Sequence, residues 1–88
     1  MNSYVIEFAD GSISEHFCQD DEQAVQQALE ILRDLGHDDA VAADQWDANG
    51  VNDDGEPMKR ILIWENKNDA KNDNGAKSIA QVVAFGRP

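Results

Sequence analysis

Residues 20–36 of the chain read DDEQAVQQALEILRDLG, and this stretch decides the fold. Asp20 as N-cap puts Gln23 at the capping-box spacing, and the acidic residues after Asp20 suit the positive end of a helix dipole. Gly36 is the residue expected just beyond a helix C-terminus. The stretch therefore predicts an amphipathic helix from Asp21 to Leu35. Its apolar stripe, at i, i+3 and i+4 spacing, consists of Ala24, Val25, Ala28, Leu29, Ile31, Leu32 and Leu35.

The residues before this helix predict a β-hairpin. Residues 4–8 and 13–17 each alternate along the chain, as half-buried strands do. Asp10-Gly11 between them is typical of a two-residue type I′ turn. Such a turn pairs Phe8 with Ile13 and gives the hairpin one large apolar face. The apolar side chains expected to pack on the core from this face are Tyr4, Ile6, Phe8, Ile13 and Phe17.

Three further strands are predicted after the helix. The first, over residues 40–46, alternates but is rich in alanine, a poor strand former. Residues 47–57 have the Asn-, Asp- and Gly-rich composition of turns. The strand over residues 58–65 is apolar on both faces, which is typical of a central strand. Residues 79–85 close the chain as a strand, and a short helix from Ser78 is the alternative that remains open.

This order of elements, a β-hairpin, one helix and then three strands, predicts an α+β fold. One helix covers only one face of a sheet, so the expected architecture is a two-layer sandwich with a mostly antiparallel sheet of about five strands. The chain of 88 residues is the length of a single small domain, residues 1–88. The face that the helix leaves open must be polar or meet a partner.

Charge is distributed unevenly along the chain. The formal net charge is −11, but residues 1–57 hold 15 carboxylates and one basic residue, Arg33, whereas residues 58–88 hold three carboxylates and six basic residues. The stretch from Asp34 to Glu56 contains eight carboxylates and no Lys or Arg. A field of this sign attracts basic surfaces and repels nucleic acid and anionic membranes. Solubility is the simpler explanation of the same charge.

This charge pattern predicts a non-enzymatic module that binds a basic protein surface, with a nucleic-acid-binding protein as the expected partner. Its sharpest form is a nucleic-acid mimic, and small acidic inhibitors from phages and mobile elements, including some anti-CRISPR and anti-restriction proteins, are similar in size and charge. Trp46, flanked by Asp44 and Asp47, is a candidate hot spot, although a core position is the more common role of a tryptophan. The residues predicted to form the partner-binding surface are Glu22, Glu30, Asp34, Asp38, Asp39, Asp44, Trp46, Asp47, Asp53, Asp54 and Glu56.

The alternative is a small cytoplasmic interaction or assembly domain whose acidity serves only solubility. Its open sheet face or a strand edge would form a homodimer or dock a partner by strand addition. The apolar residues expected on that face are Val5, Val41, Ala43, Ala80, Val82 and Ala84. The lone Cys18 fits a reducing cytoplasm. No apolar run approaches the ~20 residues that span a membrane, so no membrane partner is expected.

No catalytic, cofactor or metal site is predicted. His16 and Cys18 share one side of a strand, opposite the predicted core face, but neighbouring carboxylates raise the pKa of a thiol. Residues 47–56 form an oxygen-rich loop, yet Val51 and Asn52 stand where an EF-hand needs a ligand and a glycine. The basic residues after position 57 form no stripe with aromatic residues between them, so direct nucleic-acid binding is not expected.

Overall fold

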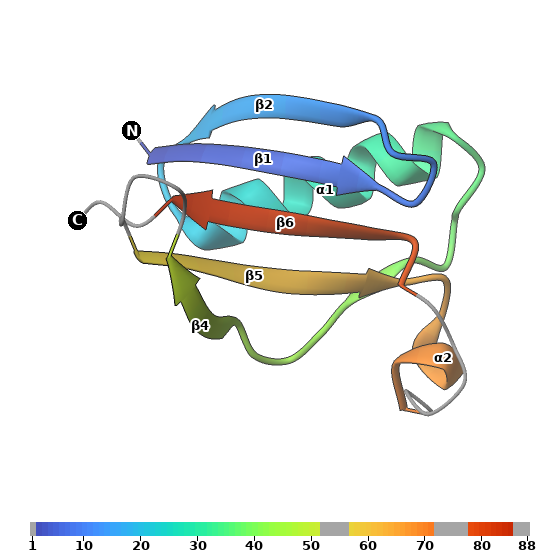
Figure 1. Ribbon diagram of the computed structural model, residues 1–88. Helices are drawn as coiled ribbons and strands as arrows, with labels where there is room; N and C mark the ends of the chain where they lie inside the picture. Colours follow the sequence, from blue (N-terminus) through green and yellow to red (C-terminus); the bar gives the residue numbers. More distant parts are fainter. Residues whose placement is uncertain (1, 52–56, 72–77, 86–88) are drawn as a thin grey trace.

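The computed structural model describes residues 2–51, 57–71 and 78–85. Figure 1 shows a twisted sheet whose strands run across the view, with the long helix behind it. The short second helix lies beyond one end of the sheet. The elements are β1 (Asn2–Phe8), β2 (Ile13–Cys18), α1 (Asp21–Asp34), β3 (Val41–Ala42), β4 (Asp47–Val51), β5 (Pro57–Trp64), α2 (Lys67–Lys71) and β6 (Ala80–Phe85).

The strands form one sheet in the order β2-β1-β6-β5-β3, and β4 pairs with β5 as well. Every one of these pairings is antiparallel. Helix α1 packs on one face of the sheet and leaves the other open (Figure 1). The predicted α+β fold, a two-layer sandwich with the helix on one face, is confirmed. The closing segment is the strand β6 between β1 and β5, so the helical alternative for residues 79–85 is wrong.

The N-terminus of α1 is capped by Asp20, as predicted. Its Oδ1 accepts a hydrogen bond of 2.8 Å from the backbone N–H of Gln23. The Gln23 side chain accepts in turn from the backbone N–H of Gln19 at 2.7 Å, one residue before the cap. In a capping box that second bond comes from the cap residue itself, so the arrangement is a shifted version of the predicted one.

The C-terminus of α1 ends in a Schellman motif. Gly36 has a φ of 102°, a left-handed conformation that glycine adopts without a steric cost. The N–H of Gly36 donates to the carbonyl of Arg33, and the N–H of His37 donates to the carbonyl of Leu32. The helix stops at Asp34, one residue before the predicted end.

The turn between β1 and β2 is one residue longer than predicted. Gly11 N–H donates to the carbonyl of Phe8, and Phe8 N–H donates to the carbonyl of Ser12, both at 2.9 Å. Ala9, Asp10 and Gly11 therefore form a three-residue loop. A type I′ turn needs positive φ at both central residues, but Gly11 has it (φ 92°) and Asp10 does not. Asp10 instead accepts hydrogen bonds from the N–H and the hydroxyl of Ser12.

The longer loop shifts the hairpin register by one residue. Ile13 lies opposite Glu7 and not opposite Phe8. Because side chains alternate between faces, this shift moves every side chain of β2 to the face opposite the predicted one. Ile13 and Phe17, predicted to face the core, are 62% and 69% exposed. The prediction for β2 is therefore wrong about its face, although right about its existence.

The hydrophobic core lies between α1 and the covered face of the sheet. Cys18 belongs to this core and does not lie on the open face as predicted. The predicted small-residue patch is also wrong for β6, because Ala80, Val82 and Ala84 are buried under α1. The buried members of the core are Tyr4, Ile6, Cys18, Ala24, Ala28, Leu29, Leu32, Ala40, Ile61, Ile63, Ala80, Val82 and Ala84.

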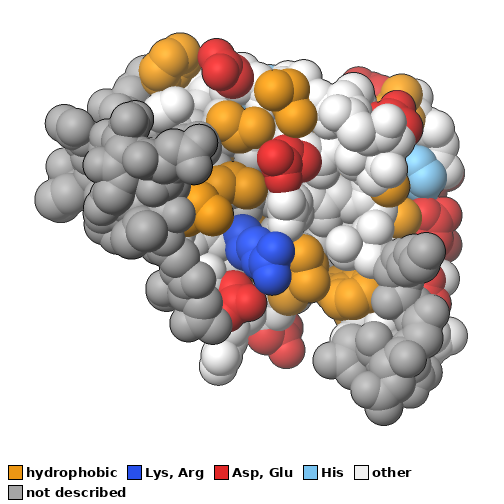
Figure 2. All heavy atoms as spheres, in the orientation of Figure 1, with side chains coloured by type: hydrophobic (Ala, Val, Ile, Leu, Met, Phe, Trp, Pro, Cys, Tyr) orange, Lys and Arg blue, Asp and Glu red, His pale blue; other side chains and the backbone are white. Residues whose placement is uncertain are grey.

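The open face of the sheet mixes apolar, acidic and basic side chains, as Figure 2 shows. Val5 of β1 and Val83 of β6 lie opposite each other at its centre, and Val83 is buried. Apolar side chains of β2 continue this face outward to the sheet edge, where they are exposed. The open face thus combines a packed centre with an exposed apolar margin.

The segment between α1 and β5 differs most from its prediction. Residues 40–46 were expected to form a strand, but only Val41 and Ala42 do so. Residues 47–51, expected to be a turn, form β4 against β5, with an irregular register between Asp47 and Gly50. Hydrogen bonding to an available edge of β5 thus overrides the local turn preference, because strand formation depends strongly on tertiary context.

Candidate functional site

Five of the predicted site residues lie on the outer side of α1 and in the loop after it. We name this group the α1 acidic surface, and its members are Glu22, Glu30, Asp34, Asp38 and Asp39. All five are exposed. Arg33 is the only basic residue within α1. Within residues 2–51, 57–71 and 78–85, none of the five carboxylates forms an ion pair.

The other predicted site residues are not part of this surface. Asp44 is exposed and lines a separate hollow of about 390 Å³ beside Trp64 and α2. Trp46 is partly buried and packs against the core, and the Nζ atom of Lys59 lies 5.2 Å from the centre of its ring. These contacts favour the core role of Trp46 over that of an exposed hot spot. Three predicted residues lie outside the described ranges: Asp53, Asp54 and Glu56.

Asp47 has a basic neighbour across the sheet. Its Oδ2 lies 4.0 Å from the Nε of Arg60, and both side chains are about half exposed. The residue before Arg60, Lys59, points to the other face of the sheet and pairs with Asp21. The acidic and basic parts of the sequence therefore meet in space along β5. The separation seen in the sequence overstates the separation in the folded protein.

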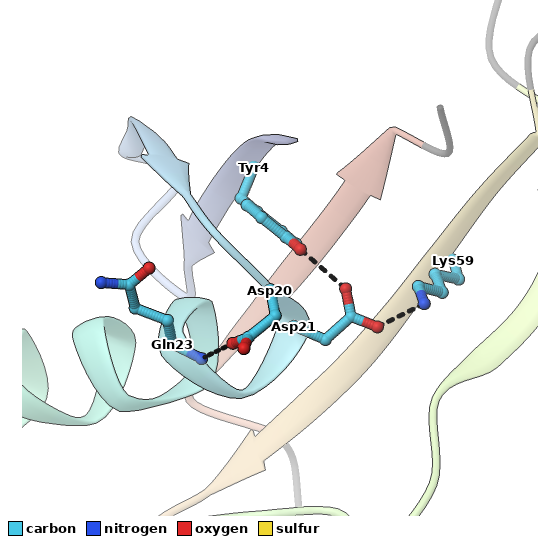
Figure 3. A network of polar contacts seen from close by, with 5 residues as sticks. All are labelled: Tyr4, Asp20, Asp21, Gln23 and Lys59. Atoms are coloured by element: carbon cyan, nitrogen blue, oxygen red, sulfur yellow. Dashed lines mark hydrogen bonds and ion pairs between the residues drawn. The ribbon is translucent and has the colours of Figure 1, made fainter. Parts of the chain in front are cut away.

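Asp21 joins the helix to the sheet in a network that sequence reasoning missed. Its carboxylate accepts a hydrogen bond of 2.7 Å from the hydroxyl of Tyr4 and forms an ion pair with Lys59 (Figure 3). Tyr4 is 1% exposed, whereas the Asp21 and Lys59 side chains are each about one-third exposed. The sequence marked Asp21 only as a helix-start residue, because Tyr4 and Lys59 are distant in the chain and no local pattern links them.

The pKa values in this network follow from burial and from its hydrogen bonds. Burial, together with the hydrogen bond to Asp21, raises the pKa of Tyr4 to about 12. Partial burial alone would raise the pKa of Asp21, but the hydrogen bonds from Lys59 and Tyr4 outweigh it and lower that pKa. At neutral pH the phenol of Tyr4 is therefore neutral and Asp21 is a carboxylate. A tyrosine and an aspartate in these states suit a structural clamp better than proton transfer near pH 7.

The lone thiol is in an unreactive setting. Cys18 is the buried last residue of β2, and burial, followed by the charge of Asp20, raises the pKa of its thiol. This raised pKa agrees with the prediction that neighbouring carboxylates raise the pKa of the thiol. His16, on the same strand, has its Nε2 2.7 Å from the hydroxyl of Ser14. Because the thiolate is the reactive form of cysteine, this environment disfavours nucleophilic chemistry.

The described residues contain no group of three or more His, Cys, Asp or Glu side chains that could hold a metal ion. The second histidine also has a partner, since the Nδ1 of His37 lies 2.8 Å from the Oε2 of Glu65. Much of the oxygen-rich loop weighed as a calcium site lies outside the described residues.

Comparison with known protein families, with curated proteins and with solved structures gave no match to this chain. Neither helix in the described part of the chain combines the length and the apolar character needed to cross a membrane. The inference of function therefore starts from the surfaces of the molecule itself.

Proposed function

We propose that this protein is a non-enzymatic, acidic protein-binding module that docks its α1 acidic surface on the basic surface of a nucleic-acid-binding protein. One contrast supports the proposal. Asp21 and Asp47 lie against Lys59 and Arg60, whereas the five carboxylates of the α1 acidic surface are exposed and have no ion pair within the described residues. Exposed charges of one sign attract a complementary surface and speed the encounter with it. A cytoplasmic location suits the free Cys18.

The spacing of these carboxylates indicates whether a groove for single-stranded nucleic acid or a channel for duplex DNA matches them better. Glu22 and Asp34 are separated by about 18 Å along the helix axis, at 1.5 Å per residue. Duplex DNA carries about ten phosphate charges over that length, and a single strand carries about five. The helix presents three carboxylates, and Asp38 and Asp39 follow just beyond its end. A groove that holds single-stranded nucleic acid is therefore a better complement to the α1 acidic surface than a channel for duplex DNA.

Occupation of such a groove would make the module an inhibitor of its partner. This role agrees with the similarity in size and charge to some anti-CRISPR and anti-restriction proteins. The interaction would be largely electrostatic, because the α1 acidic surface consists of five carboxylates. Salt at physiological strength screens such charges over about 8 Å, so affinity should fall as salt is added.

A binding experiment with purified domains tests the proposal. The immobilised protein is exposed to a panel of nucleic-acid-binding domains with basic grooves, with and without a single-stranded oligonucleotide. We expect at least one domain to bind, to be displaced by the oligonucleotide, and to lose about tenfold in affinity between low and physiological salt. Binding that the oligonucleotide leaves unchanged would contradict the proposal, as would the absence of binding across the panel.

Two variants locate the binding surface. The double substitution Glu30→Lys with Asp34→Lys reverses two charges of the α1 acidic surface and should weaken binding at least about tenfold. Asp69→Lys makes the same type of change on α2, outside that surface, and should leave the affinity nearly unchanged. Equal losses in both variants would indicate a general effect of net charge and would exclude docking through α1.

A further inference from the structure

Strand β2 forms one edge of the sheet and has an unpaired side. Among the described strands it pairs with β1 alone, and Figure 1 shows it as the outermost strand. Natural proteins commonly protect such an edge with proline, with bulges, with very short strands or with rows of charge. β2 has six residues, contains no proline and carries one carboxylate, Glu15. Its edge is therefore open to pairing with another strand.

The hydrogen-bond pattern shows which residues offer their backbone at this edge. Residues of an antiparallel strand direct their N–H and C=O groups alternately toward one neighbour and toward the other. The bond from Phe8 N–H to the Ser12 carbonyl sets the phase, so Ser14 and His16 bond toward β1. The backbone groups of Ile13, Glu15 and Phe17 point away from β1. Three donors and three acceptors are thus presented in a row.

The same three residues present their side chains on the open face. Ile13 is 62% exposed and Phe17 is 69% exposed, and they are two of the three large apolar side chains with high exposure among the described residues. Glu15 lies between them and is exposed. The edge therefore displays an apolar–acidic–apolar pattern of side chains together with a row of unpaired backbone groups. Neither the side chains nor these backbone groups make contacts that hold the described fold together.

We propose that the free edge of β2 binds an extended segment of a basic partner protein by strand addition. Main-chain hydrogen bonds to Ile13, Glu15 and Phe17 provide affinity, and side chains at alternate positions provide specificity. Charge complementarity defines the occupant as a segment in which a Lys or Arg, placed opposite Glu15, is flanked at alternate positions by apolar residues opposite Ile13 and Phe17. This site is separate from the α1 acidic surface and does not depend on it.

A second copy of the chain is a poorer occupant than a basic segment. Antiparallel self-pairing centred on Glu15 would place two carboxylates directly opposite each other, which destabilises a sheet. Each copy also carries a net charge of −11, so the copies repel one another. A basic segment removes both penalties.

Peptide binding followed by amide hydrogen exchange tests this inference. The probe is a short synthetic peptide with two valines flanking a central lysine at alternate positions and threonines between them. In the free protein the amides of Ile13, Glu15 and Phe17 should exchange quickly, whereas those of Ser14 and His16 should be protected. The peptide should protect the first three, and a peptide with glutamate in place of lysine should bind about fivefold more weakly.

Variants separate this site from the α1 acidic surface. Phe17→Ser should weaken peptide binding about tenfold, because it removes the larger apolar contact. Glu15→Lys should reverse the preference, so that the glutamate peptide binds better than the lysine peptide. Asp69→Lys, with the same charge change on α2, should leave the preference for the lysine peptide in place.

Three results would overturn the inference. The first is no protection of Ile13, Glu15 and Phe17 at saturating peptide. The second is equal binding of the lysine and glutamate peptides. The third is a dimer in sedimentation that Phe17→Ser dissociates, since a second copy would then be the occupant. Each result leaves the α1 acidic surface untested, so the two proposals can fail independently.

Discussion

The covered and open sides of the sheet use the same kinds of side chain in different ways. On the covered side Tyr4, Asp21 and Lys59 satisfy one another, and within the described residues no buried side-chain polar atom lacks a partner. On the open side and its margin, Phe17 and Glu15 are exposed. The groups that hold the fold together are therefore internally matched, whereas the exposed groups of the open side are ones that the fold does not use.

The same contrast appears between two adjacent residues. Asp21 and Glu22 follow each other in the first turn of α1 and have the same charge. Asp21 turns toward the sheet and is paired, whereas Glu22 is exposed on the α1 acidic surface. A count of carboxylates treats the two equally, but the charge of Asp21 is balanced by Lys59, whereas that of Glu22 is presented to solvent. The number of carboxylates thus overstates the acidity that this protein presents, whereas the net charge of −11 already includes the charge of Lys59.

The largest difference between the two regions should appear in stability. Asp21→Ala leaves the buried Tyr4 hydroxyl without an acceptor, and such a loss costs about 1–3 kcal/mol in free energy of unfolding. Glu22→Ala removes an exposed carboxylate near the helix start and should cost about 0.5 kcal/mol or less. Chemical denaturation of both variants measures the difference. Equal destabilisation would show that the network of Tyr4, Asp21 and Lys59 is not a structural clamp.

Titration of Tyr4 tests the same network from the alkaline side. It is the only tyrosine in the chain, so the ultraviolet absorbance of phenolate reports it alone. Burial and Asp21 raise the pKa of Tyr4 to about 12. Because the folded pKa lies above the unfolded one, the stabilisation is complete below about pH 10 and is lost as the pH rises toward 12. Asp21→Asn removes the smaller cause, so the transition should move down yet stay above 10.

At acid pH the stabilising contribution of Asp21 depends on pH in the opposite direction to that of Tyr4. The pKa of Asp21 is lowered in the folded protein, so its stabilising contribution is present above its unfolded pKa of about 4 and is lost as the pH falls through the folded value. Asp21→Asn should flatten the decline in stability below about pH 4. Some decline should remain, because hydrogen bonds from Ser12 also lower the pKa of Asp10. Thermal unfolding of the unmodified protein and of Asp21→Asn across this pH range measures the difference. Identical dependence of stability on pH in the two proteins would contradict the prediction.

Much of the fold follows from local sequence. The helix from Asp21 is specified by its cap, its apolar stripe and Gly36, all of which lie within or beside it, and its bounds were predicted to within one residue. β5 and β6 followed from β-branched and apolar composition. β4 did not, because its strand conformation depends on pairing with β5, and a local pattern rich in Asn and Gly cannot report that pairing.

The candidate site was less predictable, for two physical reasons. First, one extra loop residue at Ala9 changed the face of every residue in β2, so the exposure of Phe17 was hidden from the alternation pattern. Second, ion pairs across the sheet join residues far apart in sequence, so the pairing of Lys59 with Asp21 had no local sign. The outward position of Glu22, Glu30 and Asp34 on α1 could be predicted because it follows from helical periodicity.

The smallest expected effect belongs to the open side. Phe17→Ala removes a large aromatic side chain, yet Phe17 is 69% exposed, so the free energy of unfolding should change by only about 0.5 kcal/mol. Ile6→Ala on the covered side, where Ile6 is 1% exposed, should cost about 2–5 kcal/mol and serves as the control. If Phe17 faced the core, as the two-residue turn predicted, its removal would cost about 3–5 kcal/mol. Equilibrium denaturation of the two variants therefore tests the hairpin register, and with it the set of residues that β2 presents on the open face.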